Sequence, residues 1–227
     1  MSDSASQSWG NWFGPAQPPE AAAVRAKHRL AEAMRQVIER LVTSDAPATE
    51  LETTAGQLEH FAAELASHSR SPGLWGVPES ATSGTVGAFF DLSPLIGRAN
   101  PLAPPIDLRE ENGAAVGRVR FGCAYEGPPG CVHGGFIAAA FDEILGFAQS
   151  MTGKPGMTGT LRVRYLKPTP LHTPLEFNAR IERVEGRKIF TLGSLHAGAE
   201  LTAEADAIFI SVPRERMLAL AAARPHP

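Results

Sequence analysis

Residues 131–150 read CVHGGFIAAAFDEILGFAQS, and this stretch is predicted to be the buried helix around which the rest of the chain folds. At about 100° per residue its larger apolar side chains fall on one stripe that must face a core, namely Phe136, Ile137, Ala140, Phe141, Ile144, Leu145 and Ala148. The opposite face has little side-chain bulk beside one acid, since it consists of Gly135, Ala138, Ala139, Asp142 and Gly146. A backbone, a partner subunit or a ligand can therefore come close to the Asp142 carboxylate.

The start of this helix is predicted to bind a negatively charged oxygen. Gly134 and Gly135 leave backbone N–H groups free in the first turn. With the positive end of the helix dipole, these groups can hold an anion or a developing oxyanion. Asp142, two turns later, is then expected to act on the bound carbonyl or to orient a nucleophile toward it. A solvated carboxylate is the alternative for Asp142, and Glu143, about 100° around the helix, is a second candidate acid.

Four segments together resemble a known family. VHGGFIAAAFDEILG, MTGTLRVRYLKPTP, VEGRK and EADAIFI resemble the hotdog-fold acyl-CoA thioesterases of the PaaI-like branch and their mitochondrial long-chain relatives. The resemblance extends from Val116 to Val212, about the length of one such domain. It implies an α+β hotdog fold, in which an antiparallel sheet wraps a long central helix, and hydrolysis of acyl-CoA thioesters without a metal or another cofactor.

The resemblance also implies roles for individual residues. Asp142 is the expected catalytic carboxylate, Gly134 and Gly135 the oxyanion amides, and Thr158 a helper across the subunit boundary. Thr158 shares the alternation of Thr160, Arg162 and Arg164, which predicts that it lies on the polar face of its strand. Alternatively, the Thr158 hydroxyl only forms a hydrogen bond with the backbone at the start of the strand.

His133 is interpreted as a residue that positions the helix start, with a general base or a purely structural histidine as alternatives. Members of the PaaI-like branch often carry an asparagine in the segment that corresponds to 118–132, and none occurs there. This departure favours the long-chain relatives, which rely on His, Asp and Thr.

Basic residues are predicted to hold the phosphates of CoA. Residues 158–188 contain seven basic and three acidic side chains, in a chain whose net charge is −3. This local excess suits a nucleotide tail, and the residues expected to bind it are Arg162, Arg164, Lys167, Arg187 and Lys188. Solvated charges on strand faces are the alternative for each.

Composition limits the class of protein. With 227 residues, 43% of them hydrophobic, the chain can bury one full domain plus an appendage. The acidic balance gives no reason to expect nucleic acid as a partner. Cys123 and Cys131 are expected to be free thiols, and the sequence predicts no metal site because it lacks C-x-x-C pairs and grouped histidines. With no apolar run that could span a membrane and no signal peptide at the start, a cytoplasmic protein is expected.

The first third of the chain is predicted to be separate from the thioesterase-like domain, with domains at 1–80 and 81–227. Residues 1–19 are interpreted as a loose arm whose aromatic side chains dock elsewhere. Helical spacing then predicts helices over 20–42 and 49–67, which form a hairpin. The favoured interpretation is that this hairpin packs against the domain or stabilises a dimer.

The remaining chain is predicted to form an antiparallel sheet. A strand is expected over 85–92, followed by a proline-rich loop over 93–105. This loop either forms one wall of a substrate cleft or is a tether on the protein surface. Alternation and tight turns predict further strands over 115–123, 158–166, 175–184, 187–196 and 201–212. Several are apolar on both faces, which predicts cover by the helix on one side and by a partner on the other, hence a homodimer or a dimer of dimers.

Two classes of function remain open from the sequence. The first is hydrolysis of an acyl-CoA thioester in fatty acid metabolism, with Asp142 as general base or nucleophile and a medium or long acyl chain favoured. The second is a non-catalytic acyl-CoA binder or sensor on the same fold. A lone acid among small residues favours the first, because a pure binder has no use for it. Hydratases of this fold are a third option, but the Asp/His arrangement that they generally use was not found.

Overall fold

The computed structural model describes residues 22–68, 91–154, 156–213 and 216. Residues 1–19, most of the strand predicted over 85–92 and the expected domain boundary near residue 80 lie outside these ranges. Asp91 and Leu92, the described end of that predicted strand, are not extended. The elements are α1 (Ala22–Leu41), α2 (Ala48–Ala66), β1 (Asp107–Glu111), β2 (Ala114–Val119), η2 (Cys123–Tyr125), α5 (Gly134–Ser150), β3 (Gly156–Tyr165), β4 (Leu175–Glu185), β5 (Lys188–Ala197) and β6 (Glu200–Ser211).

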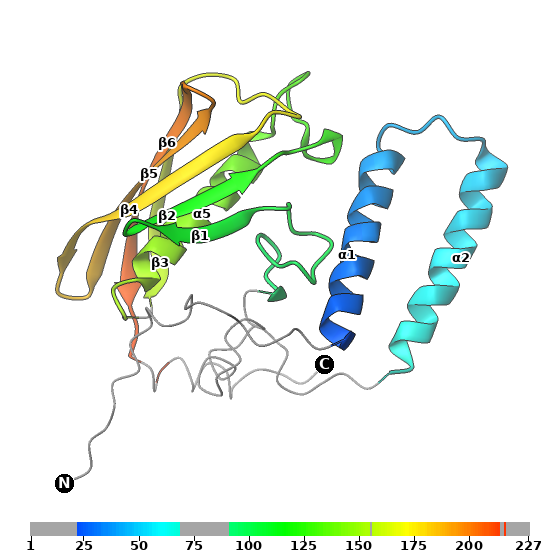
Figure 1. The fold of residues 1–227 in the computed structure, drawn as a ribbon, viewed down its shortest axis with the longest axis horizontal. Helices are drawn as coiled ribbons and strands as arrows, with labels where there is room; N and C mark the ends of the chain where they lie inside the picture. The colour runs from blue at the N-terminus through cyan, green and yellow to red at the C-terminus, as the bar shows by residue number, and fades with distance from the viewer. Residues whose placement is uncertain (1–21, 69–90, 155, 214–215, 217–227) are drawn as a thin grey trace, which may run out of the picture.

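One antiparallel sheet carries the domain, with the strand order β1-β2-β4-β5-β6-β3. Helix α5 lies against one face of this sheet (Figure 1). The predicted apolar stripe of α5 is buried there, and the rings of Phe141 and Phe177 meet edge to face at 5.0 Å. Side chains that alternate along β5 and β6 complete the core, among them Ile189, Leu195 and Phe209. The predicted α+β hotdog architecture is confirmed.

A hairpin that the sequence analysis missed begins the sheet. Strands β1 and β2 are joined by a two-residue turn in which Asn112 and Gly113 both have positive φ, 53° and 77°. An Asn-Gly pair is the strongest short signal for such a turn, but the charged sequence DLREE does not suggest a strand. The predicted strand over 115–123 ends early, at Val119, because the chain turns into η2 before α5.

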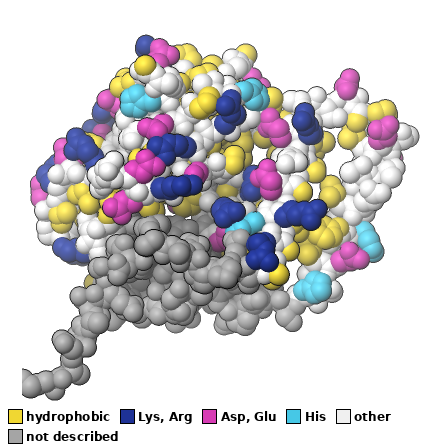
Figure 2. Space-filling model, viewed as in Figure 1, with side chains coloured by type: hydrophobic (Ala, Val, Ile, Leu, Met, Phe, Trp, Pro, Cys, Tyr) yellow, Lys and Arg dark blue, Asp and Glu magenta, His cyan; other side chains and the backbone are white. Residues whose placement is uncertain are grey.

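The outer face of the sheet is only partly covered by the residues that the structure describes. Phe190, Leu192, Ile208 and Ile210 are half-buried on this face, opposite α5. Among the described strands, β3 pairs only with β6 and therefore forms one edge of the sheet. Figure 2 shows basic and acidic side chains interspersed over the visible face. On β2, Arg118 pairs with carboxylates of β1 and β4.

The predicted helical hairpin is present, and its two helices differ in how they pack. Helix α1 stands beside the sheet, and α2 lies on the side of α1 that faces away from the sheet (Figure 1). His28 is buried and bonds to Asp91, Arg35 donates to the carbonyl of Asn100 at 3.0 Å, and Glu39 reaches backbone amides of η2. No residue of α2 is buried. Among the described residues, no helix is long and apolar enough to cross a membrane.

Candidate active site

Asp142 and Thr158 meet between α5 and β3. Asp142 is half-buried on the face of α5 that carries glycine and alanine, and the Thr158 hydroxyl donates to Asp142 Oδ1 at 2.8 Å. The bond holds one carboxylate oxygen and forms within one chain. That Thr158 acts across a subunit boundary stays a prediction.

A β-bulge explains how Thr158 reaches the helix side. The register of β3 against β6 shifts between Thr158 and Thr160, so that Thr158 lies opposite the buried Phe209. A bulge moves the following residues by one position and reverses which face they occupy. The prediction that Thr158 shares the polar face of Arg162 is therefore wrong, because simple alternation was counted through Gly159.

At the start of α5, a histidine side chain caps a backbone amide of the helix. His133 is the N-cap residue, and its Nδ1 accepts a hydrogen bond of 3.0 Å from the Gly135 amide. This geometry matches the interpretation of His133 as a residue that positions the helix start. The Gly134 amide has no hydrogen-bond partner among the residues that the structure describes. Of the two expected oxyanion amides, Gly134 is the one whose N–H is available.

Tyr165 covers the Gly134 turn, and the sequence analysis did not single it out. Its hydroxyl donates to the carbonyl oxygen of Gly134 at 2.8 Å. A Cβ at Gly134 would lie 3.3 Å from the tyrosine ring, so glycine allows this close approach. The alternation of Tyr165 with Leu161 and Val163, which pack against the core, was a signal that it faces the helix.

Glu143, the second candidate acid, faces a different neighbour. It accepts a hydrogen bond of 3.3 Å from the Ser93 hydroxyl in the proline-rich loop. Burial raises the pKa of the Glu143 carboxyl, an effect that the Ser93 hydrogen bond opposes and the nearby Asp142 charge strengthens. The loop thus packs on α5 at Ser93 and Ile96, and Glu143 serves that contact.

The basic residues predicted to bind phosphates fall into two groups. Arg162 and Arg164 lie on the sheet face opposite α5, and Lys167 follows the end of β3. All three pair with carboxylates at 2.5–3.8 Å, contributed by Glu200, Glu204 and Asp206. Arg187 and Lys188 lie at the turn between β4 and β5, where Arg187 Nε donates to the carbonyl of Ser211. Only the second group keeps charges that no described carboxylate neutralises.

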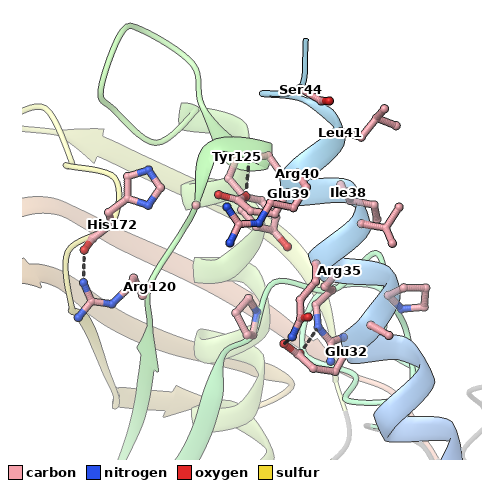
Figure 3. A pocket seen from close by; sticks show the side chains of 17 residues that line it. Glu32, Arg35, Ile38, Glu39, Arg40, Leu41, Ser44, Arg120, Tyr125 and His172 are labelled. Carbon is pink, nitrogen blue, oxygen red and sulfur yellow. Dashed lines mark hydrogen bonds and ion pairs between the residues drawn. The ribbon is translucent and has the colours of Figure 1, made fainter. Parts of the chain in front are cut away.

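A second cluster of reactive side chains lies away from Asp142. Glu39, Cys123 and His172 approach one another. Glu39 and His172 line a cleft of about 830 Å³ between α1 and the sheet domain (Figure 3). Burial and the Glu39 charge raise the pKa of the Cys123 thiol. Desolvation by itself would raise the pKa of Glu39, but hydrogen bonds from two backbone amides lower it. Both cysteines are free thiols, as predicted.

Comparisons with known proteins point to one family. The Thioesterase superfamily model matches residues 129–204. The chain is 38% identical over 89 residues to acyl-coenzyme A thioesterase THEM4 of Xenopus laevis, and 36% identical over 99 residues to that of Mus musculus. These matches cover 38% and 43% of this chain, and 40% and 43% of the relatives, so the chain spans about two fifths of their length. The crystal structure of a thioesterase superfamily protein aligns with a TM-score of 0.72 and 33% identity, covering 86% of this chain and 94% of that chain.

Proposed function

Because the chain belongs to the thioesterase superfamily, we propose that it hydrolyses acyl-CoA thioesters to a carboxylic acid and CoA. The observation that carries the proposal is the contact between Asp142 and Thr158, which orients a carboxylate on a helix face otherwise made of glycine and alanine. Such a face leaves room for a flat thioester beside a base. The names of the THEM4 relatives support acyl-CoA as the substrate class.

The proposed reaction assigns separate tasks to Asp142 and Gly134. Asp142 accepts a proton from water as the water oxygen bonds to the thioester carbon. The Gly134 N–H stabilises the negative charge that develops on the carbonyl oxygen, aided by the helix dipole. The C–S bond then breaks, and the CoA thiolate takes up the proton. The Gly135 amide can join Gly134 only when it is released from His133.

We propose that these two groups serve one carbonyl only when they come from two chains. Gly134 and Asp142 are eight residues apart on α5, which is about 12 Å along the helix axis at 1.5 Å per residue. An Asp142 that acts on a carbonyl held by the amides of its own helix is therefore not the arrangement that we propose. We propose a homodimer, the minimum of the expected assemblies, in which Asp142 and Thr158 of one subunit face the Gly134 turn of the other. The edge strand β3 and the half-exposed small face of α5 support this arrangement.

Nucleophilic attack by Asp142 is the competing mechanism. It would form a mixed anhydride between Asp142 and the acyl group, which water then cleaves. Single-turnover hydrolysis in ¹⁸O-labelled water separates the two. Direct attack by water places the label in the released acid, whereas cleavage of an anhydride at the enzyme carbonyl places it in Asp142, which peptide mass spectrometry detects.

The phosphates of CoA are proposed to bind Arg187 and Lys188, since Arg162, Arg164 and Lys167 are already paired. A medium or long acyl chain is proposed because the helix presents an apolar stripe and the proline-rich loop packs beside it.

The deciding experiment measures thiol release from a panel of acyl-CoA esters of increasing chain length, together with equilibrium binding of the same esters. A thioesterase releases thiol with a rate that depends on chain length. Tight binding without thiol release across the panel would instead identify an acyl-CoA binder and overturn the proposal.

A further inference from the structure

We propose that Glu39, Cys123 and His172 form a binding site for a divalent transition-metal ion, with Zn²⁺ the best fit, and that the ion fastens α1 to the sheet domain. The three residues come from α1, from η2 and from the loop before β4. No short sequence motif links them, since 84 and 49 residues separate successive members. The site is distinct from Asp142 and does not depend on thioester hydrolysis.

The separations between donor atoms suit one tetrahedral ion. Cys123 Sγ lies 3.3 Å from His172 Nε2, and one donor atom from each of the three residues lies within 4.8 Å of the others. With Zn–S and Zn–N bonds of roughly 2.3 and 2.0 Å, a tetrahedral angle separates sulfur from nitrogen by about 3.5 Å. Donor atoms that lie as far apart as 4.8 Å must move toward one another when the ion binds.

The donor set favours a borderline metal over a hard one. A thiolate, an imidazole and a carboxylate together match Zn²⁺, whereas Mg²⁺ and Ca²⁺ prefer oxygen ligands alone. A divalent ion would also neutralise the two negative charges that Glu39 and the Cys123 thiolate bring together. Glu39 and His172 line the cleft beside α1, so the fourth position would open toward water there (Figure 3).

The Glu39 carboxylate is held in place by the backbone. It accepts hydrogen bonds from the amides of Cys123 at 2.7 Å and Ala124 at 3.0 Å. Gly122 makes this approach possible, because a Cβ there would lie 2.4 Å from Glu39 Oε1. Oriented ligands of this kind lose little entropy when a metal binds.

The backbone of His172 is held on both sides as well. Its amide donates to the carbonyl of Phe121 at 2.8 Å, and its own carbonyl accepts from the Arg120 guanidinium. His172 has a φ of 55°, a region that non-glycine residues seldom occupy. Such a conformation persists where its surroundings enforce it, and it commonly marks functional positions. Here it directs the imidazole toward Cys123.

Metal binding can be measured directly on the full chain. The protein is stripped with a chelator, kept reduced, and titrated with Zn²⁺ by calorimetry and with Co²⁺ by absorption spectroscopy. We expect one ion per chain, with Co²⁺ giving the strong visible bands of a tetrahedral site and a thiolate-to-cobalt charge-transfer band in the near ultraviolet. Weak octahedral Co²⁺ spectra, or several weak sites per chain, would mean adventitious binding and overturn the proposal.

Three variants assign the ligands. Cys123→Ser and His172→Gln should each weaken Zn²⁺ binding by at least about 100-fold, beyond the 10–100-fold typical of losing an outer partner. Cys131→Ser, which removes the other thiol, is the matched control and should bind as the parent does. Circular dichroism of the metal-free proteins checks that all three are folded. Equal affinity of Cys123→Ser and the parent would rule out this site.

Hydrogen exchange tests the fastening of α1. Zn²⁺ should slow the exchange of amides in residues 22–41 by severalfold in the parent and in Cys131→Ser, and leave them unchanged in Cys123→Ser. Because no part of this measurement involves thioester turnover, a negative result leaves the proposed activity untouched. One bound ion without any change in α1 exchange would refute the fastening.

Discussion

Thr158 and Asp142 are joined by a 2.8 Å hydrogen bond within one chain, although Thr158 lies near the start of β3 and Asp142 lies two turns inside α5. The β-bulge after Thr158 makes this possible, because it returns the hydroxyl to the helix side of the sheet. In the proposed two-chain site, the partner subunit supplies the Gly134 amide.

Replacing Asp142 with asparagine should lower kcat for acyl-CoA hydrolysis by about 100-fold or more and leave substrate binding nearly unchanged. The variant loses a base or nucleophile that acts only in the transition state. Steady-state kinetics and equilibrium binding measure the two effects. Glu143→Gln is the matched control and should keep wild-type turnover, since Glu143 faces Ser93. Normal turnover by Asp142→Asn would move the chemistry to another residue.

Thr158→Val should lower kcat by roughly 10-fold, because a hydrogen bond to a charged group contributes about 1.5–3 kcal/mol and only part of it acts in the transition state. Thr158→Ser keeps the hydroxyl and should retain most of the activity. The comparison is made under single-turnover conditions, so that product release does not mask the chemical step. If valine and serine variants behave alike, the hydroxyl has only a structural role.

The proposed two-chain site can be tested by complementation. Gly134→Pro removes the amide hydrogen while leaving a residue that the first helical position tolerates. Homodimers of Gly134→Pro and of Asp142→Asn should both be nearly inactive. Co-expressed, they form mixed dimers in which one site is intact, so up to half of the wild-type activity per mixed dimer should return. Light scattering should show at least a dimer at micromolar concentration. An active monomer would contradict the arrangement.

Glu143 should make the protein less stable as pH rises. Its pKa in the folded chain is raised by burial. Between about pH 4.3, the ordinary value, and the higher folded value, the folded chain holds a proton that the unfolded chain has lost. Stability therefore falls through this interval, and the penalty is complete above the folded pKa. Glu143→Gln should be more stable than the parent in urea at pH 7, and the difference should vanish below about pH 4. An unchanged difference across pH would exclude this origin.

Reversing the charges of Arg187 and Lys188 should raise KM for acyl-CoA and leave turnover of a short thioester without the nucleotide nearly unchanged. These residues lie at a turn and can supply only uniform binding. Added salt should imitate the substitution, since exposed charges are screened within about 8 Å at physiological ionic strength. Equal shifts for both substrates would place the phosphate site elsewhere, with Arg162 and Arg164 next to be tested.

The sequence was sufficient to predict the central helix, its apolar stripe and the four strands after it. The spacing of apolar residues and the residues at the turns determine these elements locally. The face occupied by Thr158 was not predictable from alternation, since a bulge at Gly159 changes the parity and no residue pattern marks it uniquely. Strand β1 was missed because its charged residues do not alternate, although Asn112 and Gly113 signalled the turn that follows it.

Contacts between distant segments were beyond prediction. Glu39 was an ordinary acid on an amphipathic helix, and His172 an ordinary loop histidine. Only the docking of α1 brings both beside Cys123. The 12 Å between Gly134 and Asp142, by contrast, follows from helix rise alone.

Helix α1 is attached to the domain along one line of polar anchors, formed by His28, Arg35 and Glu39. Spacings of seven and four residues keep these three side chains within about 40° of one another around the helix. The attachment therefore has an angular register that an apolar stripe would lack. Inserting one residue between Arg35 and Glu39 would rotate Glu39 by about 100° around the helix relative to His28 and Arg35. The helix could then keep the contacts on one side of the insertion but not those on the other. Insertions or deletions between His28 and Glu39 therefore disrupt this attachment, whereas those outside that segment leave the three anchors in register.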